Sequence, residues 1–311
     1  MRPVGGGSSS GLARFRREQA DVKRWTRPLS LLVTVFIVAL YAPYFYGVVV
    51  AWRSNPYAGH VLFVPALAAI LVWVDRDQFR RPRFRRAAPA VTGLGIAAAL
   101  LVVGYGKSAL LLQTLSFGAA VAAIAWWGYG AAGLRRAGFL LAFLMLMTPP
   151  PRETVAAISP AVQHFVAIVC GGVLRVIGVP VIQDGAVLGL VGVTLEVAEE
   201  CSGLRFLPIL FVFVAAFARV TMRTFGQQAL LIAMSIPVAV MANVTRVVLT
   251  SAGTYFVAPD IATGPSHYYI GKACWVAALL VMIGVAGVLR ARGEGVAITI
   301  SAPSVSQAGA R

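Results

Sequence analysis

Long apolar stretches alternate with short polar loops along most of the chain. A helix of about 20 predominantly apolar residues crosses the ~30 Å hydrocarbon core of a bilayer, and several stretches approach or exceed that length. The pattern predicts an all-α polytopic membrane protein with about eight transmembrane helices. The predicted spans lie near residues 29–52, 61–74, 90–105, 109–127, 137–148, 203–218, 229–250 and 270–289.

One further apolar segment, residues 155–178, contains Gln163, His164 and Arg175. If it crossed the membrane, every later loop would change sides and its basic residues would face outward. We therefore predict that it lies in the outer interface as an amphipathic or re-entrant helix.

The pattern changes again over residues 181–198. Asp184-Gly185 is a turn signal, and Val193, Leu195 and Val197 alternate with polar residues, as half-buried strands do. This segment predicts a small extracytoplasmic β-hairpin.

Composition and charge support the membrane interpretation. Of 311 residues, 59% are hydrophobic and 12% are charged, against roughly 25% charged in an ordinary soluble domain. The formal net charge of +16 would indicate nucleic-acid binding in a soluble protein, but Lys and Arg cluster here in short loops between apolar runs. If the amino terminus is cytoplasmic, most of the 27 Lys and Arg residues fall on the inner side, as the positive-inside rule requires.

The two ends of the chain lack such apolar spans. Residues 1–28 are Gly/Ser-rich and then basic, which predicts a disordered cytoplasmic tail. Residues 291–311 predict a second disordered tail. The region between them, residues 29–290, is expected to form one transmembrane domain in the cell membrane.

The three cysteines, Cys170, Cys201 and Cys274, are too few and too scattered for a disulfide framework. No C-x-x-C spacing indicates a metal or redox site, so neither a metal nor an organic cofactor is expected. Any chemical role therefore belongs to a single thiol.

Cys201 stands between the predicted hairpin and the next span, at the outer mouth of the bundle. A thiol at a helix amino terminus is biased toward the nucleophilic thiolate by the peptide dipoles. Glu199 and Glu200 oppose that effect because negative charge disfavours a second anion. A nearby cation is therefore needed, and Arg205 and His267 are candidates to supply it.

Two more polar residues fall on the same predicted side. Arg246 lies near the outer end of an apolar span, where a charge costs on the order of 2.5 to 3.5 kcal/mol and usually faces a cavity or partner. Asn243, one turn earlier, extends that polar face. His267 lies in a turn-rich loop, and imidazole is a suitable acid or base for a thiol. His60, also outside, would either touch substrate or cap the second span.

Each residue also has a simpler explanation. Cys201 alone is typical of a small buried hydrophobe, Arg246 of an arginine that snorkels to the head groups, and His267 of an interfacial anchor. Their common position at the outer side favours a joint role.

In this order, the motifs resemble the exosortase/archaeosortase family of prokaryotic membrane proteins. The matching segments are residues 198–205 around the cysteine, Asn243-Val244-Thr245-Arg246, and His267 before the last span. Weaker matches are Ala58-Gly59-His60, Pro149-Pro150-Pro151 and Gly178-Val179-Pro180-Val181. The resemblance covers roughly residues 29–290. It departs after the histidine, where two tyrosines follow instead of the acidic residue of many relatives.

This resemblance implies a cysteine transpeptidase or protease that cleaves a carboxy-terminal sorting signal of exported proteins on the extracytoplasmic side. Such a signal combines a short motif of the Pro-Glu-Pro type, a transmembrane helix and a basic tail. The resemblance implies that Cys201 attacks the scissile carbonyl, His267 exchanges protons, and Arg246 stabilises the oxyanion or positions substrate. The expected partners are these exported proteins and membrane lipids, with no nucleic acid.

Two other functions fit the residues. A transporter or channel would use Arg246, Asn243 and Arg205 to bind an anionic solute. A non-catalytic membrane component of polysaccharide export would not need Cys201. Against the transporter, the polar residues gather at one face and no internal repeat is evident.

Overall fold

The computed structural model describes residues 38–79, 88–190, 193–197, 204–262 and 264–300, with side chains as far as residue 292. The chain divides into two compact units, Met1–Gly47 and Val48–Arg311. Of the first unit, residues 38–47 are described and are helical. The rest of the fold and the candidate site belong to the second unit.

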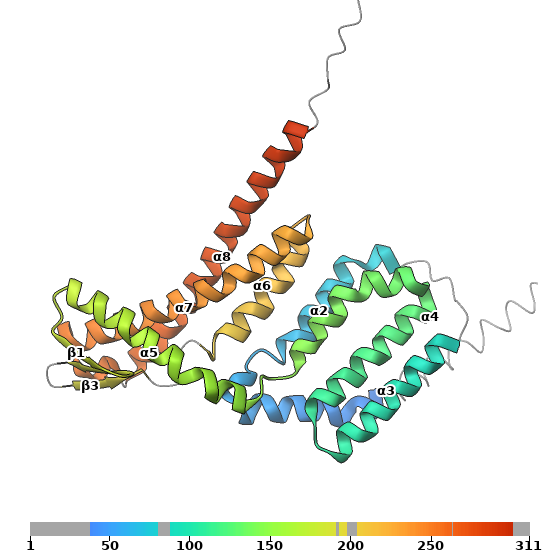
Figure 1. Cartoon of the computed structure of the whole chain (residues 1–311), viewed down its shortest axis with the longest axis horizontal. Coiled ribbons are helices and arrows are strands. Elements are labelled where there is room, and N and C mark those ends of the chain that lie inside the picture. The colour runs from blue at the N-terminus through green and yellow to red at the C-terminus, as the bar shows by residue number, and fades with distance from the viewer. Residues whose placement is uncertain (1–37, 80–87, 191–192, 198–203, 263, 301–311) are drawn as a thin grey trace, which may run out of the picture. The chain divides into compact units, whose positions relative to one another are not determined.

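The second unit is mainly helical, with a small sheet beside α5 and α7 (Figure 1). Helical residues 48–54 open it. The α-helices that follow are α2 (Phe63–Val74), α3 (Ala88–Gly106), α4 (Leu110–Leu144), α5 (Arg152–Val176), α6 (Leu207–Thr221), α7 (Phe225–Phe256) and α8 (Pro265–Ile300). Short 3-10 turns are η1 (Pro56–Ala58), η2 (Arg76–Phe79), η3 (Met145–Met147) and η5 (Pro259–Ala262).

Six helical segments in the described part of the chain are long and apolar enough to cross a membrane. They are Pro56–Val74, Ala88–Gly106, Leu110–Met147, Arg152–Val176, Phe225–Phe256 and Pro265–Arg292. The sequence predicted about eight spans. The difference has three causes. Two predicted spans are joined in the single segment Leu110–Met147, α6 has only 15 residues, and the predicted first span begins outside the described residues. In addition, the segment predicted to lie in the interface, α5, meets the length and apolarity criteria.

Helix α4 consists of two arms that fold back on each other. Gly130 has a φ of 64° and a ψ of −155°, which is outside the helical region and suits glycine. Thr148 Oγ1 donates a hydrogen bond to Thr114 Oγ1 at 2.8 Å, although a continuous helix would separate these residues by about 50 Å. The bend falls between the two predicted spans 109–127 and 137–148.

The predicted hairpin is a three-stranded antiparallel sheet. Strands β1 (Val181–Asp184), β2 (Val187–Leu190) and β3 (Val193–Glu196) pair in the order β1-β2-β3. Gly185, with a φ of 58°, begins the predicted turn between β1 and β2. The prediction was therefore wrong by one strand, because the segment between the turn and the second alternating run is itself a strand.

The sheet, α5 and α7 share one hydrophobic core. It combines Val166, Ala167, Cys170 and Leu174 of α5, Val181, Leu188, Leu190 and Val197 of the sheet region, and Val244 and Val247 of α7. The His164 ring Nδ1 lies 3.0 Å from the Gly185 carbonyl oxygen, so α5 is also tied to the β1–β2 turn. This packing holds the end of β3 against α7.

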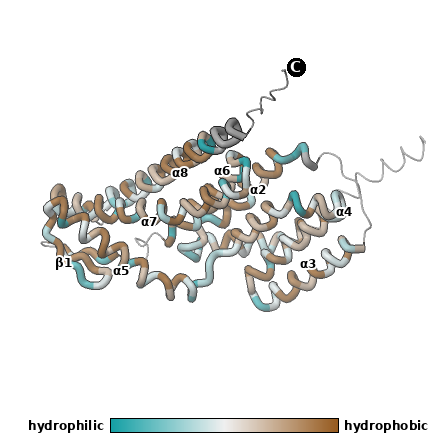
Figure 2. The backbone as a smooth tube through the Cα atoms, turned by 45° about the horizontal axis from the view of Figure 1, so that its top comes forward, coloured by the Kyte–Doolittle hydropathy of each residue, from teal (hydrophilic) through white to brown (hydrophobic). Residues whose placement is uncertain are grey.

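The other side of α7 packs against α6 and α8. Their core contains Leu210, Val214 and Ala218 of α6, Leu231 and Ala239 of α7, and Ala278, Met282 and Ala286 of α8. Helix α7 begins with a capping box, in which Thr224 and Gln227 exchange side-chain and backbone hydrogen bonds. Figure 2 shows that much of α8 is hydrophobic, as a membrane helix requires. Helix α7 is therefore the common support of the sheet and of α8.

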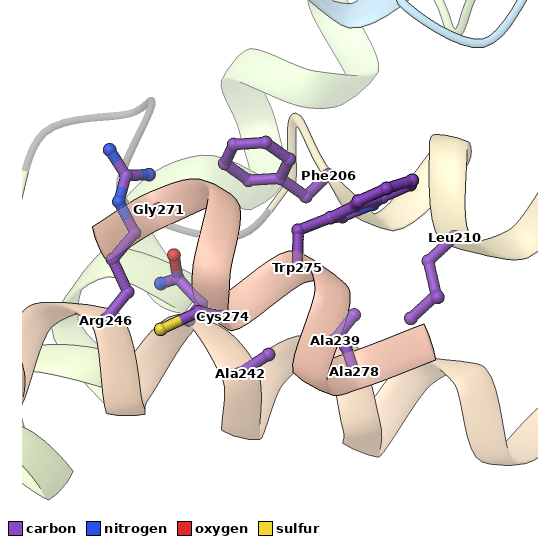
Figure 3. A pocket seen from close by; sticks show the side chains of 10 residues that line it. Phe206, Leu210, Ala239, Ala242, Arg246, Gly271, Cys274, Trp275 and Ala278 are labelled. Atoms are coloured by element: carbon purple, nitrogen blue, oxygen red, sulfur yellow. The ribbon is translucent and has the colours of Figure 1, made fainter. Parts of the chain in front are cut away.

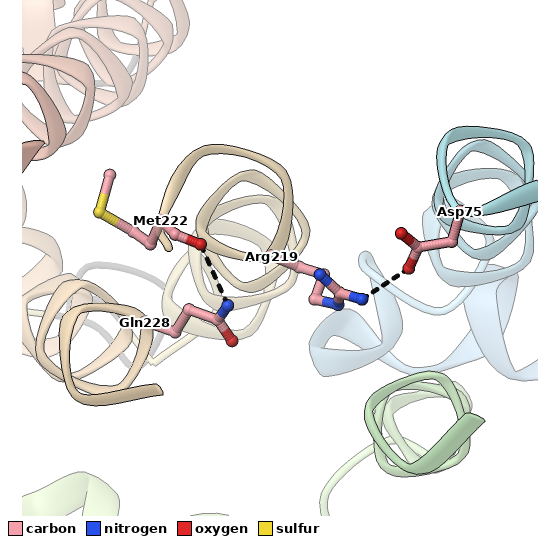
Figure 4. Close-up of polar contacts among 4 residues, drawn as sticks. All are labelled: Asp75, Arg219, Met222 and Gln228. Atoms are coloured by element: carbon pink, nitrogen blue, oxygen red, sulfur yellow. Dashed lines mark hydrogen bonds and ion pairs between the residues drawn. The ribbon is translucent and has the colours of Figure 1, made fainter. Parts of the chain in front are cut away.

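Three charged residues meet at one end of α2 and α6: Asp75, Arg136 and Arg219. The predicted spans place each of them in a different loop on the inner side of the membrane. Arg219 Nη2 donates to Asp75 Oδ2 at 2.6 Å, and both side chains are about three-quarters buried (Figure 4). The Arg219 guanidinium lies 5.8 Å from the Phe139 ring centroid, and Arg136 lines the same small pocket. Nearby, Gln228 Nε2 donates to the Met222 carbonyl oxygen at 3.2 Å.

Candidate active site

Arg246 and His267 meet where α7 passes the first turn of α8. Arg246 Nη2 lies 2.7 Å from His267 Nε2. A guanidinium can only donate, so Nε2 is the acceptor and the neutral imidazole carries its proton on Nδ1. The two residues are 21 positions apart in sequence and are joined because α7 and α8 pack side by side (Figure 1).

Two further residues fix the position of the Arg246 side chain. Its guanidinium carbon lies 5.5 Å from the centroid of the Phe206 ring, in cation–π range. On the α8 side is Gly271, where an added Cβ would lie 3.1 Å from Arg246 Nε (Figure 3). A side chain at this glycine would crowd the arginine. The Arg246 side chain is thus positioned by the His267 imidazole, the Phe206 ring and the backbone of α8 at Gly271.

A cavity of about 730 Å³ opens beside this pair. Its lining includes four cationic side chains, Arg53, Arg205, Arg246 and Lys272. No Asp or Glu lines it among the residues that the structure describes. The amino-terminal turns of α6 and α8 also contribute to its wall, and helix amino termini carry partial positive charge. The cavity therefore favours a negatively charged or strongly polar occupant.

A second, smaller cavity of about 80 Å³ also reaches Arg246 and His267. Its other walls include Glu196 and Val197 at the end of β3, together with Thr250 and Ser251 of α7. Thr250 and Ser251 are buried, so the polar face of α7 continues beyond Arg246. Through this cavity the sheet becomes part of the surroundings of the Arg246–His267 pair.

Asn243 lies one turn before Arg246 on α7 and is 4% exposed. With Arg246 it lines a small pocket of about 20 Å³, walled by Phe206, Gly271, Cys274 and Trp275 (Figure 3). The predicted polar stripe thus runs along the buried side of α7.

The remaining predicted residues have different surroundings. Arg205 is exposed and lines the large cavity. His60 is 3% exposed and does not line this cavity, whereas its neighbour Gly59 does. Cys201, Glu199 and Glu200 lie outside the described residues.

Sequence reasoning missed four residues of this region: Arg53, Phe206, Gly271 and Lys272. Arg53 and Lys272 were visible as basic residues on the predicted outer side, a signal that could have placed them near Arg246. Phe206 and Gly271 carried no such signal, because one is an apolar residue in an apolar span and the other is a glycine in a helix.

The fold and this cavity define a multi-pass α-helical membrane protein with a cationic, histidine-containing site at one end of its helices. Residues 52–285 match the family model described as Transmembrane exosortase (Exosortase_EpsH). The chain therefore belongs to the transmembrane exosortase family, as its motifs predicted. No curated protein and no solved structure matches it significantly.

Proposed function

We propose that this protein is a membrane-embedded cysteine transpeptidase or protease that cleaves the carboxy-terminal sorting signal of exported proteins. The observation that carries the proposal is the 2.7 Å contact between Arg246 and His267 at the wall of a large cationic cavity. Membership of the exosortase family supports it independently. The substrate signal would be of the Pro-Glu-Pro type, followed by a membrane helix and a basic tail.

Cys201 is proposed as the nucleophile, and chain connectivity supports this assignment. Val197, four residues earlier, lines the small cavity beside His267, and Arg205, four residues later, lines the large one. Four residues span at most about 14 Å, so the chain on either side allows the Cys201 thiol to reach the Arg246–His267 pair. Glu199 and Glu200 would lie beside this thiol in sequence, where they either meet the basic tail of the substrate or orient His267.

The protonation of the Arg246–His267 pair suggests an order for the steps of cleavage. In the resting state His267 Nε2 accepts from Arg246. When a substrate carbonyl takes over the Arg246 donor, Nε2 is released and accepts the thiol proton of Cys201. The thiolate sulfur then bonds to the carbonyl carbon, and the carbonyl oxygen becomes an oxyanion beside the guanidinium. His267 returns the proton to the leaving amine as the peptide bond breaks. A nucleophile, either an amine or water, finally resolves the thioester.

We further propose a cytoplasmic amino terminus and an extracytoplasmic site, with about eight crossings in which the two arms of α4 count separately. The clustering of Arg136 and Arg219 with Asp75 supports this topology, because all three are predicted to be on the inner side. Asp75 and Arg219 lie at the ends of α2 and α6 that are remote from the cavity, and Arg136 of α4 lines the same small pocket. In Figure 1, α5 runs across the direction of α6 and α7, which supports its interfacial placement.

The proposed function is tested by co-expressing the protein with a reporter that carries a candidate sorting signal and measuring the intact reporter mass. Wild type should remove the anchor helix, whereas Cys201→Ala should leave the reporter at full length. Cys170→Ala is the matched control, since this thiol is buried between α5 and α7, 3.6 Å from the Val244 carbonyl oxygen. Processing by Cys201→Ala, or loss of processing by both variants equally, would contradict a nucleophilic role for Cys201.

The cationic cavity also suits the alternative of an anion transporter. The two functions differ in what Cys201→Ala does, because a transporter would retain solute flux without the thiol. A non-catalytic component of polysaccharide export would likewise tolerate that change.

A further inference from the structure

An apolar groove of about 620 Å³ runs along the outside of the α7–α8 pair. On α7 it extends from Met234 through Met241 to Leu249, which corresponds to about 22 Å of helix at 1.5 Å per residue. This length covers most of the ~30 Å hydrocarbon core of a bilayer. Met241 and Leu249 are at least half exposed in the described structure. The groove therefore presents an open apolar surface of membrane dimensions.

The α8 wall of the groove is built from small residues. Ala273 and Ala277 are one turn apart, and Ala278 and Val281 continue the wall. In a membrane, small residues at this spacing let another helix backbone approach closely, which strengthens helix–helix packing. The α7 wall offers one polar side chain, Thr245, whose hydroxyl donates to the Met241 carbonyl oxygen at 2.9 Å. The lining of the groove is therefore suited to binding an apolar helix and not a polar ligand.

The groove adjoins the candidate active site. It shares Ala242 and Cys274 with the small pocket shown in Figure 3. That pocket in turn shares Arg246 and Gly271 with the cationic cavity. An occupant of the groove would therefore end beside the Arg246–His267 pair. Because Arg53, Arg205 and Lys272 line the cavity there, the segment next to the occupant's helix should carry carboxylates.

We infer that this groove docks the transmembrane helix of the substrate, with the acidic segment next to that helix entering the cationic cavity. The inference rests on the proposed function, which it deepens by assigning the binding surface for the anchor. Docking the helix would hold the neighbouring segment, which contains the scissile bond, at the Arg246–His267 pair. Holding the scissile bond in a fixed position speeds its cleavage.

The docking is tested separately from cleavage by photo-crosslinking of the full-length protein in membranes. The photoreactive residue p-benzoylphenylalanine is placed at Met241 or Val281 in the groove, in a Cys201→Ala background that leaves the reporter uncut. Matched controls are Ile236 on α7 and Ile283 on α8, which do not line the groove. The exposed fractions are 58% and 50% for the groove positions against 49% and 53% for the controls. The partner is a single-pass reporter with an acidic segment before its membrane helix.

Adducts with the reporter helix from both groove positions, several times more abundant than from the controls, are expected. Equal adducts from all four positions would overturn the inference. Lipid adducts alone from the groove would also overturn it and would assign the groove to an acyl chain.

A second measurement relates the groove to catalysis. Ala277→Leu, which fills the groove, should slow cleavage of the membrane reporter by about tenfold, the factor given by ~1.4 kcal/mol of lost binding. It should leave cleavage of a soluble peptide with the same acidic segment unchanged. Val276→Leu, next to it but outside the groove, is the control. Equal slowing of both substrates would overturn the inference. If wild type cleaves neither substrate, the proposed function fails, while the crosslinking result still decides whether the helix docks.

Discussion

Two arginines on neighbouring helices contact different kinds of partner. Arg219 on α6 donates to the Asp75 carboxylate at 2.6 Å, so its charge is neutralised within the fold. Arg246 on α7 donates to the neutral imidazole of His267 at 2.7 Å and lies over the Phe206 ring.

The contrast distinguishes a structural cation from a functional one. An ion pair between α2 and α6 joins two helices and leaves little field for a ligand. The Arg246 guanidinium instead lines a cavity together with three other cations, and their summed positive potential attracts an anionic ligand to that cavity.

The largest expected effect comes from exchanging each arginine for glutamine. Arg246→Gln should lower the rate of reporter cleavage by about 10²- to 10³-fold, the usual loss when an oxyanion donor is removed. Arg219→Gln should change that rate by less than about twofold, because Arg219 and Asp75 lie at the end of α6 that is remote from the cavity. Intact-mass time courses measure both. Similar losses in the two variants would break the distinction between them.

A smaller effect is expected from crowding the site arginine without removing it. Gly271→Ala places a methyl group 3.1 Å from Arg246 Nε, and the resulting displacement should cost about tenfold in cleavage rate. Gly284→Ala on the same helix meets open space and should leave the rate unchanged. The comparison of these two alanines, by the same time courses and by thermal unfolding, separates displacement of Arg246 from a general effect on α8. Equal rates in the two variants would show that the position of Arg246 is not critical.

The Arg219–Asp75 ion pair should contribute to the free energy of unfolding. A double-mutant cycle with Arg219→Gln and Asp75→Asn should give a coupling free energy of about 1 kcal/mol for unfolding in detergent, since the pair is only partly buried. The cycle requires reversible unfolding of wild type and all three variants. A coupling near zero would remove the structural role assigned to this arginine.

The smallest expected effect concerns the rim of the cavity. Lys272 is exposed, and its ammonium lies 4.2 Å from the Tyr268 ring centroid. Lys272→Met should raise KM for an acidic substrate about threefold and leave kcat unchanged, because a solvated rim charge attracts substrate without touching the reacting atoms. The wild-type KM should also rise with salt more steeply than that of the variant. A fall in kcat would instead give Lys272 a role in the chemical step.

Sequence patterns predicted the elements more reliably than their boundaries. Apolar periodicity indicated helices at α2, α3, α7 and α8, and the Asp184-Gly185 pair correctly predicted the first turn of the sheet. Strand β2 was missed because its residues show no alternation of apolar and polar side chains. The bend in α4 depends on the backbone conformation of Gly130 alone. The sequence does not distinguish Gly130 from the nearby Gly128 and Gly133.

The amino-acid sequence was sufficient to predict a multi-pass membrane protein of the exosortase family, because span length, the scarcity of charge and the order of three motifs can be read along the chain without its fold. It also brought Arg246 and His267 to the same predicted side. Three further features appear only in the folded structure: the contact between these two side chains, the packing of Phe206 and Gly271 against the arginine, and an apolar groove that adjoins the site. Such contacts depend on how α6, α7 and α8 pack, and helix packing is set by side chains far apart in sequence.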